Sequence, residues 1–134
     1  MKISDINELK KIARNVRVSI IQEVYNGKSG HPGGSLSCAD ILTALYFNQM
    51  NINPNEPKAE GRDRLVMSKG HASPALYAVL AERGYFDKKE LTAFRKLESN
   101  LQGHPDMNKV PGVDMTTGSL RTGLVMCQWN GDGI

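Results

Sequence analysis

The segment LVMSKGHASP, residues 65–74, combines an apolar run, a glycine turn and a helix start. A short apolar run at residues 65–67 passes into a polar turn with Gly70, and then into Ser73 and Pro74, which favour the start of a helix. We therefore predict a buried strand, a loop and a helix capped by Ser73. That order presents free backbone N–H groups, and the positive end of the helix dipole, to a phosphate group. An ordinary turn with His71 on the surface is the alternative interpretation.

Four helices are predicted in total. The first covers residues 5–26, where apolar side chains recur every three or four positions; Asp5 and Glu8 form its start signal and Gly27 the left-handed residue at its end. The others are expected at residues 37–50, 73–84 and 87–97, and Gly84 ends the third.

Each of the three histidines lies in a loop-like stretch that contains glycine or serine: SGHPGG, SKGHAS and QGHPD. Residues 28–35 are predicted to be a functional loop, residues 51–63 a surface connection, and residues 99–119 a long loop of a kind that is either functional or disordered. A single loop histidine is more often a hydrogen-bonded turn residue than a functional one.

The composition is that of a globular protein or part of one. Of the 134 residues, 40% are hydrophobic and 23% charged, and neither a membrane-spanning run nor a secretory signal is present, so we predict a cytoplasmic location. The net charge of +3 is scattered along the chain, which disfavours nucleic acid as a partner. Cys38 and Cys127 lack a CxxC pattern, which indicates reduced thiols rather than a disulfide framework or a zinc site.

Taken together, three strings resemble the transketolase family in order and approximate spacing: SGHPGGSLSCADILTALYF, RDRLVMSKGHASPALYAVLAERGYF and GHPDMNKVPGVDMTTGSL. The resemblance covers residues 5–120. Related thiamine-diphosphate enzymes that make deoxyxylulose phosphate or decarboxylate pyruvate share the fold but lack this set of histidine loops.

The resemblance implies an α/β fold in which helices flank a mostly parallel sheet. Residues 1–120 would be the N-terminal part of the diphosphate-binding domain, mostly helical in this section. It also implies the site residues. The catalytic residues His31 and His104 would contact the sugar substrate, His71 would lie near the cofactor's diphosphate, and backbone groups of Gly118, Ser119 and Leu120 would meet its aminopyrimidine.

The implied reaction is the transfer of a two-carbon unit from a ketose phosphate to an aldose phosphate, a reaction of the pentose phosphate pathway. The implied cofactors are thiamine diphosphate and Mg²⁺. The protein ligands of the Mg²⁺ ion would lie beyond this chain. The implied partners are sugar phosphates and either a C-terminal transketolase section or a second copy of the chain.

The resemblance stops at Leu120. The family continues GQGLS, whereas this chain reads RTGLVMCQWNGDGI. Bases that encode this tail can be chosen so that, read one base later, they give GQGLSCASGMGMA. We therefore predict that residues 121–134 are a frameshifted tail; a natural short C-terminus is the alternative. Asp132 lies in a GDG segment far too close to Leu120 to be the family's magnesium site, so we predict no metal ligand in this chain.

Three hypotheses follow from the sequence. The chain is an N-terminal transketolase subunit with an erroneous tail, an inactive product of a disrupted gene, or a small helical module that binds a phosphate ligand through its histidine loops.

Overall fold

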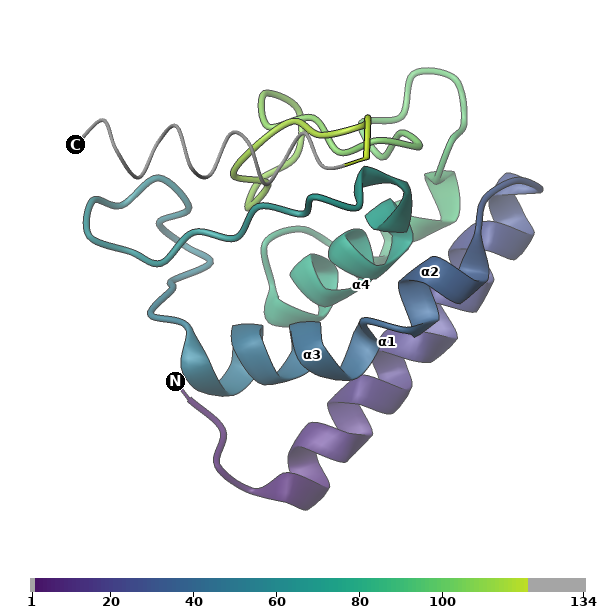
Figure 1. Ribbon diagram of the computed structural model, residues 1–134. Helices are drawn as coiled ribbons and strands as arrows, with labels where there is room; N and C mark the ends of the chain where they lie inside the picture. Colours follow the sequence, from purple (N-terminus) through teal and green to yellow (C-terminus); the bar gives the residue numbers. More distant parts are fainter. Residues whose placement is uncertain (1, 121–134) are drawn as a thin grey trace.

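The computed structural model describes residues 2–120, so the predictions for the tail lie outside the described residues. The element order is α1 (Ile6–Gly27), α2 (Pro32–Leu36), α3 (Ala39–Ala44), η1 (Leu45–Gln49), η2 (Gly70–Ala72), α4 (Ser73–Arg83) and η3 (Lys88–Ala93). Helix α4 is almost completely buried, with α1 and α3 packed against it (Figure 1). In this part of the chain, no helix is long and apolar enough to cross a membrane.

The first predicted helix is present as α1. The side chain of Asp5 caps it by accepting a hydrogen bond of 2.9 Å from the backbone N–H of Asn7. Its end differs from the prediction, because Gly27 is still helical and the left-handed residue is Lys28, with φ 49°. A Cβ atom on Gly27 would lie 3.0 Å from the carbonyl oxygen of Phe94. Glycine is needed there for close packing rather than for helix termination.

The region between α1 and residue 50 contains more helix than predicted. The single turn α2, Pro32–Leu36, begins inside the loop predicted at residues 28–35, and its first residue is proline, whose fixed φ suits a first helical position. The helix expected at residues 37–50 is divided into α3 and a π-helical turn, η1. The helix expected at residues 87–97 is shorter, a 3₁₀ segment over Lys88–Ala93 that the Asp87 side chain caps.

The strand predicted at residues 65–67 is wrong, because residues 2–120 contain no strand. A strand needs a neighbouring strand to pair with its backbone. Here the backbone N–H of Leu65 instead donates to the carboxylate of Asp114, at 2.7 Å. The helical part of the expected fold is therefore observed and its sheet is not.

Ser73 also has a different role from the predicted N-cap. Ala72 precedes α4, and the Ser73 hydroxyl donates to the carbonyl oxygen of Gly103 at 2.7 Å, joining the helix to a distant loop. The predictions for Pro74, in the first turn, and Gly84, left-handed with φ 99° at the end of α4, are confirmed.

Candidate active site

The structure brings the three histidines together. The ring centroids of His31 and His71 are 6.1 Å apart, and those of His71 and His104 are 4.8 Å apart. The rings meet edge to face, with interplanar angles of 61° and 89°. All three side chains are exposed, so their ring nitrogens remain available to a ligand.

These histidines line one open pocket of about 540 Å³. Its walls are formed by Gly30, His31, His71, Ser73, Pro74, Phe94, Arg95, Gln102, Gly103 and His104. The volume is within the range of about 300 to 1,000 Å³ that is usual for small-molecule sites. The pocket is therefore large enough for a sugar phosphate.

Two helix starts position the first two histidines. His31 has an extended backbone immediately before α2, with φ −121° and ψ 92°. His71 lies in η2, which leads directly into α4. Because α4 is the buried centre of the domain, the His71 backbone is anchored to the core.

His104 lies on a long loop that two hydrogen bonds hold against α4. The hydroxyl of Ser73 donates to Gly103 O, and that of Tyr77 donates to Gln102 O at 2.7 Å. Burial, with a smaller contribution from the charge of Glu23, raises the pKa of Tyr77 well above its ordinary value. Tyr77 therefore keeps its proton and remains a donor at physiological pH.

The predicted cofactor turn packs between two of the histidine loops. A Cβ atom on Gly70 would lie 2.9 Å from Gly118 N and 2.9 Å from Thr117 C, so the two backbones meet without room for a side chain. On the other side, a Cβ atom on Gly118 would lie 3.6 Å from the ring of His104. None of the three predicted cofactor-binding residues of this turn, Gly118, Ser119 and Leu120, lines the histidine pocket itself, and Ser119 and Leu120 are exposed.

The turn around Gly118 has the chemistry to meet a polar cofactor. The hydroxyl oxygen of Thr117 is buried and has no hydrogen-bond partner among the described residues. A buried hydroxyl in that state costs about 1 to 3 kcal/mol, which a ligand atom could recover. Together with the glycine backbone contact, this orphaned group fits the expected thiamine diphosphate. Within residues 2–120, no cluster of three or more His, Cys, Asp or Glu side chains is placed to hold a metal ion.

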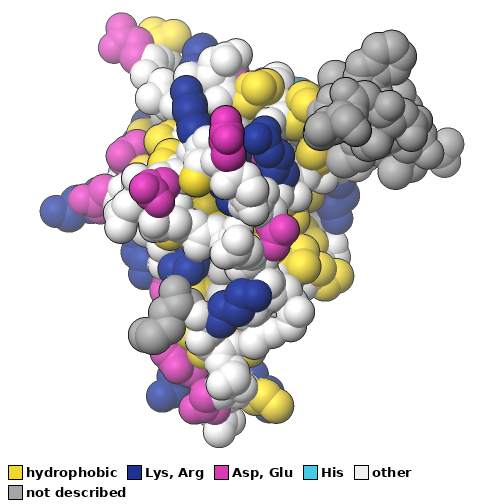
Figure 2. All heavy atoms as spheres, turned by 90° about the vertical axis from the view of Figure 1, so that its left-hand side faces the viewer, with side chains coloured by type: hydrophobic (Ala, Val, Ile, Leu, Met, Phe, Trp, Pro, Cys, Tyr) yellow, Lys and Arg dark blue, Asp and Glu magenta, His cyan; other side chains and the backbone are white. Residues whose placement is uncertain are grey.

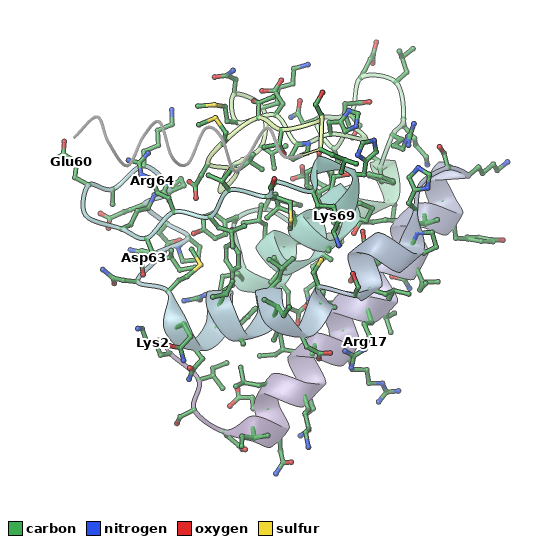
Figure 3. The ribbon with its side chains drawn as sticks, viewed as in Figure 1. Lys2, Arg17, Glu60, Asp63, Arg64 and Lys69 are labelled. Atoms are coloured by element: carbon green, nitrogen blue, oxygen red, sulfur yellow. The ribbon has the colours of Figure 1, made fainter. Side chains whose placement is uncertain are left out.

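Two cationic side chains are near the site: Arg95, which was not predicted, and Lys69, which lies in the segment predicted to present N–H groups to a phosphate. Arg95 lines the pocket with a left-handed backbone, φ 59°, and its N–H donates to Leu101 O at 2.8 Å. Lys69 donates to the Ser37 hydroxyl at 3.1 Å, which joins the turn before η2 to the end of α2 (Figure 3). Arg95 falls within the predicted fourth helix, and a left-handed arginine gives no composition signal.

Comparison with known proteins identifies the family of this chain. Residues 8–129 match the family profile described as transketolase, thiamine diphosphate binding domain. The chain belongs to this family.

Curated transketolase relatives are similar over most of this chain. The 6-deoxy-6-sulfo-D-fructose transketolase subunit of Clostridium sp. is 46% identical over 117 residues, which are 87% of this chain and 42% of the relative. An apulose-4-phosphate transketolase subunit of Phocaeicola vulgatus is 44% identical over 81% of this chain and 38% of its own length. The chain thus spans less than half of the curated relatives it matches.

Solved transketolase structures share the fold. The Pichia stipitis transketolase complex with sedoheptulose 7-phosphate superposes with a TM-score of 0.83 at 38% identity, covering 87% of this chain and 17% of the larger one. The helical arrangement of residues 2–120 is therefore that of the start of a transketolase.

Proposed function

We propose that this chain is the N-terminal section of a transketolase that transfers a two-carbon ketol unit from a ketose phosphate to an aldose phosphate. The observation that carries the proposal is the single pocket lined by His31, His71 and His104 together with Arg95. A guanidinium group suits an anionic sugar phosphate, and imidazoles suit groups that exchange protons near neutral pH. The cytoplasmic location and the pentose phosphate pathway remain predictions from the sequence.

In this proposal the chain's own residues bind the reactants and move protons. His31 and His104 would exchange protons with the hydroxyl and carbonyl oxygens of the sugar. His71 would donate a hydrogen bond to the diphosphate, while backbone groups from Gly118 to Leu120 and the Thr117 hydroxyl would hold the aminopyrimidine. When bound, thiamine diphosphate supplies the electron sink for the negative charge that develops during ketol transfer.

The rest of the active site would come from outside residues 1–120. We propose that the ligands of Mg²⁺, the parallel sheet of the domain and the C-terminal section, or a second copy, are contributed by further sequence. The chain alone would then lack ketol-transfer activity.

The tail carries a separate proposal, namely that residues 121–134 are a shifted reading of the same gene. Sequencing the gene beyond the codon for Leu120 tests this directly. A one-base change that restores GQGLS in an open frame is expected. A stop codon directly after the codon for Ile134, with no transketolase-like sequence in either of the other two reading frames, would contradict it.

A chimera tests the catalytic proposal. Residues 1–120 would replace the matching segment of the Phocaeicola vulgatus transketolase relative, and ketol transfer would be measured with the other components of that enzyme. We expect activity in the chimera and a loss of about 100-fold or more in the His31→Ala and His104→Ala variants, since positioned general acids and bases contribute about 10²- to 10⁴-fold. A folded, inactive chimera, or histidine variants with full activity, would contradict the proposal.

A further inference from the structure

A second cavity lies outside the histidine pocket and shares no lining residue with it. It has a volume of about 580 Å³ and lies between two loops, residues 57–64 and residues 107–114. The first loop is the projecting one at the left of Figure 1. This cavity has no part in the proposed ketol transfer.

The lining of this cavity is strongly cationic. Lys58, Arg62, Arg64 and Lys109 contribute four positive charges, whereas Asp114 is the acidic lining residue. Figure 2 looks onto this side of the molecule and shows Lys and Arg side chains next to apolar ones, with acidic side chains among them. Asp114 is already paired with Arg62, so three positive charges remain uncompensated within the cavity lining.

The three remaining cations have no partner in the described part of the chain. Lys58, Arg64 and Lys109 are exposed, and none forms an ion pair or a side-chain hydrogen bond with any residue from 2 to 120. The neighbouring acids do not line the cavity: Asp63 accepts a hydrogen bond from Asn51 N at 2.7 Å, and Glu60 lies on the outer part of the loop (Figure 3).

Arg62 supplies an independent sign of a missing partner. Its guanidinium donates to Asp63 O and to Asp114, but its Nε–H is buried and donates to no described residue. The Arg62 side chain is only 11% exposed. An orphaned donor of a cationic group is costly, and an anion in the cavity would satisfy it.

The walls of the cavity are fixed in place. Gly112 has φ 88°, and a Cβ atom there would lie 2.7 Å from the side chains of both Leu80 and Tyr85, so this loop is packed tightly on α4 and the segment after it. The opposite wall, residues 57–64, is joined to this loop because the Asp114 carboxylate accepts hydrogen bonds from Arg62 and from the backbone N–H of Leu65. A preformed cavity of this size is typical of sites for small molecules rather than for peptides.

We propose that this cavity binds a phosphate-bearing small molecule with at least two negative charges. Arg62, Arg64 and Lys109 hold the phosphate groups, and Met107 and Pro111 contact the remainder of the ligand. The site is distinct from the histidine pocket and does not depend on the transketolase proposal.

Calorimetric titration of the full 134-residue chain with inorganic pyrophosphate tests this site. The double variant Arg64→Gln/Lys109→Gln removes two exposed cations, and Lys10→Gln/Lys11→Gln removes the same charge from the exposed surface of α1. Loss of two charge-assisted contacts is expected to weaken binding about 100-fold in the first variant, with little change in the second. Amide spectra of both variants would show that the fold is retained.

Two further measurements test which of the two pockets binds pyrophosphate and whether the site prefers phosphate to carboxylate groups. In a His71→Ala background, which removes the hydrogen bond proposed to hold a diphosphate in the histidine pocket, the Arg64→Gln/Lys109→Gln change is still expected to weaken pyrophosphate binding about 100-fold. Citrate, which carries carboxylates instead of phosphates, is expected to bind at least about tenfold more weakly. Equal loss of binding in the two double variants, loss confined to His71→Ala, absence of pyrophosphate binding, or equal affinity for citrate would each overturn the proposal.

Discussion

Glu23 provides a quantitative test of the described core. It lies on α1, is completely buried, and neither carboxylate oxygen has a hydrogen-bond partner among the described residues. Burial raises the pKa of Glu23 from its ordinary value of 4.5 to about 10. At neutral pH the folded chain must therefore keep this carboxyl protonated, whereas the unfolded chain releases the proton.

The sign of the pH effect follows from this difference. The pKa is higher in the folded state, so the stability from Glu23 is fully present below pH 4.5 and is lost as the pH rises toward 10. One pH unit corresponds to about 1.4 kcal/mol, so Glu23 lowers the free energy of unfolding by about 3 kcal/mol at pH 7 relative to pH 4.

The perturbation is Glu23→Met, which has a similar volume, suits a helix and has no charge. We compare the free energy of unfolding of the variant with that of the original chain at each pH. The advantage of the variant is expected to be about 3 kcal/mol larger at pH 7 than at pH 4. Urea unfolding at pH 4, 5.5 and 7 measures this difference, and the exposed Glu60→Met serves as the control. A difference between variant and original that does not change with pH, or that equals the control, would refute the reasoning.

Two contacts inside the described structure give further predictions. Gly70→Ala should destabilise the chain by about 1 to 3 kcal/mol in thermal unfolding and weaken thiamine diphosphate binding, because the new Cβ would meet backbone atoms at 2.9 Å. The matched control is Gly33→Ala, which should be neutral or slightly stabilising because a Cβ there meets nothing within 4 Å. Asp114→Ala should cost about 1 to 3 kcal/mol in urea unfolding, because it removes the carboxylate that accepts hydrogen bonds from Arg62 and from the backbone N–H of Leu65. Asp40→Ala breaks an exposed pair and should cost less than about 1 kcal/mol. Equal effects within either matched pair would contradict these assignments.

Local signals in the sequence were sufficient for the main helices. Asp5 and the apolar spacing after it predicted α1, and Pro74 and Gly84 marked the two ends of α4, because caps and breakers act through neighbouring residues. Residues 28–35 were predicted as a loop because Gly30, Gly33 and Gly34 disfavour helix, yet a proline start and contacts with α1 and α4 stabilise one helical turn from Pro32.

The failures concern partners that are distant in the chain. Residues 65–67 have the composition of a strand, but a strand forms only when another pairs with it, and the backbone of Leu65 bonds to Asp114 instead. The close contact between Gly70 and Gly118 spans a similar distance and has no local pattern. The histidines were identifiable from their loops and the family resemblance, whereas Arg95 entered the pocket through a backbone conformation that sequence reasoning did not predict.

The central claim is that the histidine loops and the turn at Gly118 together form a thiamine diphosphate site. Its most direct test is a titration of the chain, with isotope-labelled histidines, followed by the ring signals of His31, His71 and His104. We predict saturable shifts of His71 and His104 with thiamine diphosphate, clearly weaker shifts with thiamine, and about tenfold weaker binding in His71→Ala. Histidine signals that stay unchanged at millimolar thiamine diphosphate would contradict the account.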